Sequence, residues 1–240
     1  MDGSLGPADA QAYAAAMRVR TGSIVLAAAL WVAAVQAAAP SAPASSPALQ
    51  QALEVYERGE WAAAREAFER LARLGVPAAD YNLAVMHLRR ELPEPSMAEA
   101  VRLMTRAAER GFVTAMVGLA QLHERGEITG QRDLPQAHRW NLRAAQAGSV
   151  DAQVEAATGF YLGRGVPKDL AAAAHWYREA ATRGDIGAQY LLASMYEAGL
   201  GVGRDLRLAR YWYEICARGG DIAAPGKVRE LDARLAAEAP

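Results

Sequence analysis

Residues 152–184 read AQVEAATGFYLGRGVPKDLAAAAHWYREAATRG, and residues 188–220 read AQYLLASMYEAGLGVGRDLRLARYWYEICARGG. The two stretches align without a gap at a spacing of 36 residues and share alanines, glycines, an aspartate and a tryptophan. A third, less regular copy begins at Ala115. A period of roughly 20–50 residues indicates one supersecondary unit that is copied and stacked, because so small a unit cannot bury its own apolar face. The sequence therefore predicts a repeat architecture rather than one compact enzyme core.

The first half of each repeat has the apolar spacing of a helix. Counted from an alanine that anchors each unit, small or apolar residues recur at offsets 4 and 5, and a ring follows at offset 8. These offsets lie on one face of an α-helix. A glycine turn ends the segment, and positive φ is easily reached there. The anchors are Ala79, Ala115, Ala152 and Ala188.

A second helix follows in each repeat and opens on an aspartate. The aspartates are Asp133, Asp169 and Asp205, and a tryptophan stands seven residues after each, at Trp140, Trp176 and Trp212. An aspartate at that place accepts hydrogen bonds from the first free amides and suits the positive helix end, so we interpret it as structural. The pattern predicts an all-α chain, an α-solenoid of stacked antiparallel helix pairs with about 36 residues per repeat.

The repeat region is expected to span residues 49–224. Its units are predicted at 49–78, 79–114, 115–151, 152–187 and 188–224, followed by a capping helix at 225–240. The unit that starts at Ala79 departs from the others, since Leu103 stands where they have tryptophan and ELPEP at 91–95 replaces the glycine turn. Atypical terminal units keep a solenoid soluble by closing its ends with a polar face.

The N-terminus has the pattern of a secretory signal. Arg18 and Arg20 precede an apolar stretch at 24–35, and small residues then offer a cleavage site before Ala38. We expect residues 1–37 to be an extension and signal peptide, with the signal itself at about 17–37 starting from Met17. An Ala/Pro/Ser-rich linker follows at 38–48. The alternative is an uncleaved membrane anchor, although the stretch from Ser23 to Ala39 is only 17 residues, shorter than the ~20 that a span prefers.

Composition and motifs give no sign of catalysis. The net charge of −1 provides no basic face for nucleic acid or an anionic membrane. No zinc-protease, nucleophile-elbow or phosphate-loop motif occurs, and the four histidines include no i, i+4 pair, so we predict no catalytic residue, cofactor or metal. The single cysteine, Cys216, replaces an alanine of the other repeats and is expected to be a small buried residue.

The repeated positions resemble the Sel1-like repeat, a relative of the tetratricopeptide repeat. In the repeat that begins at Ala152, the residues that carry the resemblance are Gly163-Arg164-Gly165-Val166, Asp169, Ala173, Trp176 and Ala180-Ala181. The resemblance implies a right-handed superhelix and protein–protein contact, often in envelope assembly or signalling. Some exported relatives carry paired cysteines and a few have been linked to β-lactams, but this chain lacks those cysteines.

By analogy with tetratricopeptide folds, the first helix of each pair is expected to line a concave groove. The residues predicted to bind a partner there are Asn82, Gln121, Glu124, Glu155, Tyr161, Tyr190 and Glu197. Tyrosines beside carboxylates and amides suit peptide recognition, since aromatics supply contact area and polar groups set direction. The alternative is that these residues form an ordinary solvated face.

Taken together, the sequence favours an exported bacterial protein, periplasmic or secreted, that binds a protein or peptide partner as adaptor, scaffold or regulator. No binding to nucleic acid and no stable membrane insertion after signal cleavage are expected. The alternative function is an envelope enzyme or binder that acts on cell wall or β-lactams, which rests on fold-level association alone.

Overall fold

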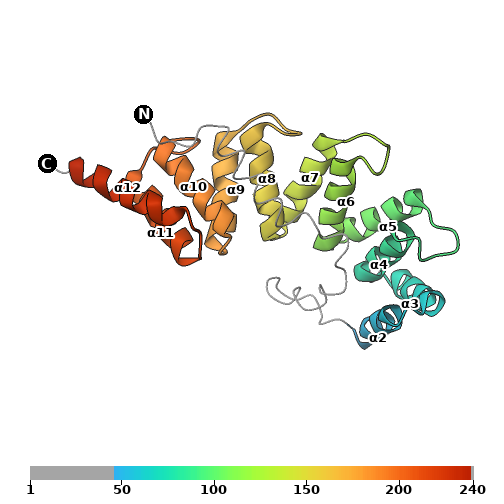
Figure 1. The fold of residues 1–240 in the computed structure, drawn as a ribbon. Coiled ribbons are helices and arrows are strands. Elements are labelled where there is room, and N and C mark those ends of the chain that lie inside the picture. Colours follow the sequence, from blue (N-terminus) through green and yellow to red (C-terminus); the bar gives the residue numbers. More distant parts are fainter. Residues whose placement is uncertain (1–45, 239–240) are drawn as a thin grey trace. The chain divides into compact units, whose positions relative to one another are not determined.

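The computed structural model describes residues 46–238, and this part of the chain is all-helical (Figure 1). Its helices come in consecutive pairs, as the repeat pattern predicts. The expected signal peptide and most of the linker lie outside the described residues. The helices are α2 (Pro47–Glu57), α3 (Trp61–Arg73), α4 (Pro77–Leu88), α5 (Met97–Glu109), α6 (Val113–Arg125), α7 (Leu134–Gln146), α8 (Val150–Leu162), α9 (Leu170–Thr182), α10 (Ile186–Ala198), α11 (Leu206–Arg218) and α12 (Ala224–Ala237).

The described chain divides into two compact units. The N-terminal unit holds α2 to α7 and ends at Ser149, and the C-terminal unit begins at Val150 and holds α8 to α12. Within the N-terminal unit α3 packs against α4 and α5 against α6, and within the C-terminal unit α9 packs against α10 and α11 against α12. Each helix pair is therefore stacked on its neighbour inside its unit, where both bury apolar surface.

Small residues form the contact surface of the first helix in each pair. The anchor alanines Ala79, Ala115, Ala152 and Ala188 are 0–2% exposed, which confirms the predicted helical face. The position directly after the anchor is also buried and was not predicted to be, since it holds polar side chains such as Asp80 and Gln189. Gln189 donates from its amide nitrogen to the carbonyl oxygen of Ala181 at 3.1 Å, so the buried amide serves a helix end.

The aspartates that open the second helices are N-caps, as predicted. Asp133 accepts from the amide of Gln136 at 3.0 Å, and Asp169 accepts from the amide of Ala172 at 2.9 Å. Asp205 accepts from the amide of Leu208 at 2.9 Å. Each bond satisfies a backbone donor that has no partner within its helix.

The repeated tryptophans are less buried than the next residue along the chain. Trp176 and Trp212 are half-buried and flank the core of the C-terminal unit, whereas Tyr177 and Tyr213 are 1% and 0% exposed. The fully buried aromatic of each second helix in this unit is therefore the tyrosine and not the tryptophan that marks the repeat in the sequence. The face that packs on the neighbouring helix is centred on the tyrosine, because Ala174 and Ala181, three residues before and four after Tyr177, are buried as well as Ala173 and Ala180.

One glycine in the turn between α10 and α11 makes a close backbone approach. Gly201 has φ 68°, and a Cβ built on it would lie 2.1 Å from the carbonyl oxygen of Leu170 at the start of α9. Only glycine reaches this conformation without strain and leaves room for that oxygen. The turn of one repeat is thereby seated on the second helix of the repeat before it.

The ends of the repeat array are closed by helices that lack the full repeat pattern. In the N-terminal unit, α2 and α3 form the predicted leading hairpin, with Phe68 fully buried. In the C-terminal unit, α12 packs on α11 through Leu231, and Cys216 is buried in the same cluster, as expected for a small packing residue. None of the helices described here has the length and apolar character needed to cross a membrane.

Candidate functional site

Five of the seven residues predicted to bind a partner keep part of their side chain at the surface. They are half-buried and comprise Asn82, Gln121, Glu124, Glu155 and Tyr161. The other two, Tyr190 and Glu197, are 4% and 5% exposed, so our expectation that they line an open groove is wrong.

Glu197 is buried because the terminal helix supplies its charge partners. Its carboxylate accepts from Arg234 at 2.9 Å and from Lys227 at 3.4 Å, both on α12, and from the hydroxyl of Tyr213 at 3.1 Å. A buried carboxylate is tolerated when such donors surround it. The residue therefore fastens α12 to the last repeat instead of facing a partner.

Tyr190 belongs to the same closed face. Its ring packs edge-on against Tyr213 with the centroids 5.0 Å apart, in the cluster that contains Leu231 of α12. Burial, helped by the nearby Asp221 carboxylate, raises the pKa of Tyr190 to about 12. In the last repeat, the surface that we expected to be open is thus covered by the capping helix.

Glu155 and Tyr161 form a polar and aromatic patch on the C-terminal unit. We call the α8 patch the set Glu155, Tyr161, Arg164 and Lys168. Arg164 lies 3.4 Å from the Glu155 carboxylate, and the Lys168 ammonium lies 5.9 Å from the centroid of the Tyr161 ring. Partial burial raises the pKa of Tyr161, which keeps its hydroxyl neutral. The cations come from the glycine turn after α8, so helix and turn together build the patch.

The predicted residues of the N-terminal unit are distributed over two helices. Asn82 on α4 donates its side-chain amide to the carbonyl oxygen of Ala78 at 2.7 Å, so part of its hydrogen-bonding capacity is used within its own helix. Gln121 and Glu124 lie three residues apart on α6, which places them on one helix face.

The N-terminal unit also contains a pocket that the sequence did not lead us to predict. It lies among α3, α4, α5 and the loop at 89–96, and its volume is about 610 Å³. Its apolar lining comes from Ala72, Leu83, Leu92, Pro93 and Leu103, and its charged lining from four arginines and three glutamates. We call it the α3–α5 pocket. The volume falls in the range of pockets that bind small molecules and short segments.

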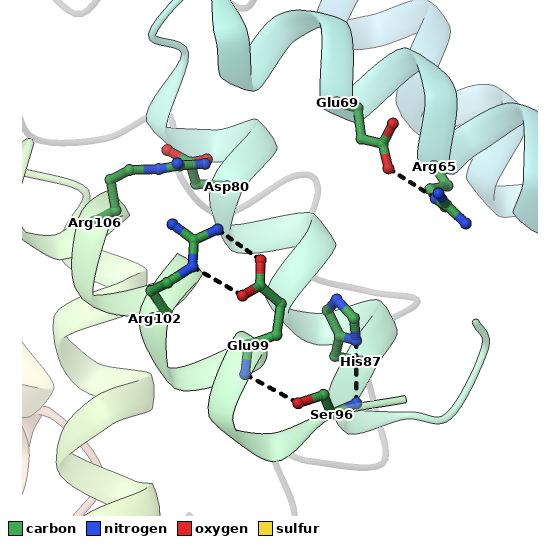
Figure 2. A network of polar contacts seen from close by, with 8 residues as sticks. All are labelled: Arg65, Glu69, Asp80, His87, Ser96, Glu99, Arg102 and Arg106. Carbon is green, nitrogen blue, oxygen red and sulfur yellow. Dashed lines mark hydrogen bonds and ion pairs between the residues drawn. The ribbon is translucent and has the colours of Figure 1, made fainter. Parts of the chain in front are cut away.

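Ion pairs line both walls of the α3–α5 pocket. Arg65 binds Glu69 at 2.7 Å on α3, and Arg102 binds Glu99 on α5 through two contacts of 2.6 and 2.8 Å (Figure 2). The bidentate bond from Arg102 lowers the pKa of Glu99, so its carboxylate stays ionised. Arg106 also lines the pocket and reaches the fully buried Asp80.

His87 stands at the edge of the pocket and holds the loop. Its Nδ1 accepts from the backbone amide of Ser96 at 3.2 Å, and Ser96 in turn caps α5 by accepting from the amide of Glu99 (Figure 2). Burial lowers the pKa of His87, and the nearby Arg65 adds to this lowering against the opposing charge of Glu99. The imidazole is therefore neutral at pH 7 and carries its proton on Nε2.

The signal for this pocket was present in the sequence as departures from the repeat. Leu103 comes seven residues after the cap Ser96, just as Trp140 comes seven residues after Asp133. Leu103 lines the pocket, and the proline-containing loop at 91–95 contributes to the lining. Among residues 46–238, no group of three or more histidine, cysteine, aspartate or glutamate side chains is arranged to hold a metal ion.

Stacked helix pairs with variable exposed side chains define a class of protein, the helical repeat proteins, whose surfaces bind other molecules. Within that class the family model for the Sel1 repeat matches residues 77–112, 113–149, 150–185 and 186–221. The chain belongs to the Sel1 repeat family, and its repeats of about 36 residues form an α-solenoid. Such repeats typically build protein-binding scaffolds.

Solved structures agree with this assignment. A Sel1 repeat protein from Oxalobacter formigenes is 32% identical, with a TM-score of 0.60, over 70% of this chain and 49% of that one. The protein c5321, a protective antigen of uropathogenic Escherichia coli with this repeat fold, is 25% identical, with a TM-score of 0.59, over 76% of this chain and 43% of that one. The chain thus spans about half the length of the solved proteins it resembles. No protein with curated function matches it.

Proposed function

We propose that the chain is an exported scaffold that binds a protein or peptide partner through the α8 patch. The observation that carries the proposal is the pairing of a half-exposed tyrosine with charges of both signs in one place. Tyrosine and arginine are enriched among the residues that dominate binding energy. Gln121 and Glu124 are proposed as additional contacts on the N-terminal unit.

The contacts within the α8 patch favour recognition because they hold the side chains in place before a partner arrives. A cation over an aromatic ring at an exposed site contributes ~0.5–1 kcal/mol, and an exposed ion pair contributes a similar or smaller amount. These energies are small, but they reduce the rotamer freedom that Tyr161 and Glu155 lose on binding. The patch carries one carboxylate and two cations, which suits a partner segment that presents an acidic residue beside an apolar one.

Export is proposed from the N-terminal sequence, in which a basic pair precedes a short apolar stretch and small residues. The similarity to a protein described as a protective antigen adds support, since antibodies must reach such an antigen. The test is the intact mass of the protein recovered from the cell envelope. A mass that starts at Ala38 is expected, and a mass that retains residues 17–37 would contradict cleavage.

The partner is identified by crosslinking in living cells followed by capture of the tagged chain and mass spectrometry. One dominant envelope protein is expected, and its capture should fall when Tyr161→Ala and Glu155→Ala are combined. The matched control is Tyr211→Ala, which removes a 52% exposed tyrosine from α11 of the same unit and lies outside the patch. Equal capture by the double variant and by the control, with unchanged helicity in both, would refute the proposal.

A further inference from the structure

The α3–α5 pocket lies beside the position at which the first Sel1 repeat has no tryptophan, whereas the other Sel1 repeats have one. Leu103 occupies the slot of the tryptophans, seven residues after the N-cap of its helix. In the C-terminal unit, Trp176 and Trp212 pack against the core from this slot. A leucine leaves space there, and the pocket opens beside it with an apolar floor that includes Leu83 and Ala72.

The polar groups of the pocket offer more donors than acceptors. Glu99 uses both carboxylate oxygens on Arg102, and Glu69 is engaged by Arg65. Glu94, the third lining carboxylate, is exposed on the loop and acts on Arg65 through its charge, so Arg73 is the lining arginine that no described carboxylate engages. Arg65 donates through Nε in that contact, which leaves its two terminal nitrogens for another acceptor. Arg73, which is exposed at the end of α3, lines the pocket and forms no ion pair within residues 46–238. His87 adds an Nε2–H donor, because its Nδ1 accepts from Ser96.

An acceptor-rich ligand with a large apolar side chain matches both properties. A carboxylate binds guanidinium groups through charge-assisted hydrogen bonds, which are about twice as strong as neutral ones. An aromatic side chain fills an apolar gap and supplies most of the contact energy in many interfaces. The volume of about 610 Å³ has room for a few residues of peptide.

We propose that the α3–α5 pocket binds a short partner segment in which an aromatic residue is followed by an acidic one. The aromatic side chain enters the space beside Leu103 in place of the missing framework tryptophan, and the carboxylate is held by Arg73 and Arg65. This site lies on the N-terminal unit and is separate from the α8 patch, so it adds a second recognition surface to the scaffold.

The test uses the full chain and the fluorescein-labelled hexapeptide SGWEGS, with SGAEGS and SGWQGS as matched peptides, followed by fluorescence anisotropy. The first peptide should bind about tenfold more tightly than the alanine peptide, since aromatic anchors commonly dominate affinity. It should bind about threefold to tenfold more tightly than the glutamine peptide, since that peptide loses one charge-assisted contact. Equal affinity of the three peptides would overturn the proposal.

Protein variants locate the binding in the pocket. Arg73→Gln should weaken SGWEGS about threefold to tenfold, whereas Arg70→Gln should change it less than about twofold, because Arg70 is exposed on the same helix but does not line the pocket. An equal loss in both variants would mean nonspecific attraction by charge and would refute the site.

Leu103→Trp tests the apolar half of the proposal by restoring the framework residue. The new side chain should fill the gap, preserve helicity and abolish peptide binding. A folded Leu103→Trp protein that binds SGWEGS as tightly as the parent would refute the proposal, and if this variant does not fold, the comparison of Arg73 with Arg70 decides. Tyr161→Ala should leave peptide binding unchanged, so failure of the α8 patch and failure of this site give different results.

Discussion

Replacing Gly201 by alanine is expected to destabilise the C-terminal unit strongly, through two separable effects. The residue has φ 68°, and placing an L-residue in left-handed backbone costs ~1–2 kcal/mol. The new Cβ would also lie 2.1 Å from the Leu170 carbonyl oxygen and 2.7 Å from the amide nitrogen of Ala171. Relieving such an overlap requires backbone movement, and overpacking of this kind costs ~1–3 kcal/mol. The expected loss is therefore ~2–5 kcal/mol.

Two other glycines of the same unit separate these effects. Gly184 has φ 92° but open space where its Cβ would be, so Gly184→Ala should lose only the conformational part, ~1–2 kcal/mol. Gly203 has neither positive φ nor a heavy atom within 4 Å, and Gly203→Ala should be neutral or stabilise by ~0.4–1 kcal/mol by restricting the unfolded chain.

Urea unfolding of the full chain, followed by far-ultraviolet circular dichroism, measures the free energy of unfolding for all three variants. The order of loss should be Gly201, then Gly184, then Gly203. A Gly201→Ala protein within ~0.5 kcal/mol of Gly184→Ala would show that the turn is not seated on α9, and the stacking of the last two repeats described above would be wrong.

Three further predictions concern the core, the capping helix and the pocket. Tyr177→Ala should cost ~3–5 kcal/mol in urea unfolding and more than Trp176→Ala, because only the tyrosine is fully buried; the reverse order would contradict the assigned helix face. Glu197→Gln should lose ~1–3 kcal/mol and speed amide hydrogen exchange in α12, and unchanged exchange would show that the helix is held without this carboxylate. Burial lowers the folded-state pKa of His87, so its contribution to stability is present above the unfolded pKa of ~6.5 and is lost as the pH falls. A plot of melting temperature against pH should therefore be shallower below pH ~6.5 for His87→Gln than for the parent, and identical slopes would argue against that lowering.

The helix pairs and their caps could be predicted because a repeat tests each position several times. An isolated aspartate before an apolar run is a weak N-cap signal. Three aspartates at one spacing, each followed by a tryptophan seven residues later, make the N-cap the favoured interpretation. The same reasoning placed Ala188 and Ala152 at helix contacts, where both are buried. The N-caps and the small residues at helix contacts depend on interactions within one repeat, so they recur in the sequence and can be recognised there.

The identity of the buried aromatic could not be predicted in the same way. Trp176 and Tyr177 are neighbours on α9, and the repeat makes the tryptophan more conspicuous because Asn141 replaces tyrosine in the second repeat. Which of two adjacent residues faces the core depends on the rotation of the helix against its neighbours, and this rotation is set by tertiary packing. Trp176, which the repeat makes conspicuous, flanks the core, whereas Tyr177, at a position that varies between repeats, lies within it.

Among the residues predicted to bind a partner, only the two in the last repeat are buried, and this too depends on tertiary packing. Tyr190 and Glu197 occupy the same helix positions as Val154 and Tyr161, which remain half-exposed one repeat earlier. The difference comes from α12, which supplies Arg234 and Lys227 to the carboxylate and Leu231 to the apolar cluster. A position inside a repeat predicts burial only when the next element is also known, and the terminal element is the one that the repeat does not describe.

Departures from a repeat thus fall into two kinds, and their contacts tell them apart. At α12 the departure is structural, since each of its charges toward Glu197 is matched and its apolar face is buried. At Leu103 the departure lies in the lining of a pocket of about 610 Å³, which also includes an arginine without an ion pair in the described chain. A framework substitution that only maintained the fold would be expected to close the gap, because unfilled apolar space costs stability. A gap that persists beside unused donors is better explained by a ligand than by packing, and this is why the α3–α5 pocket is the place to test for one.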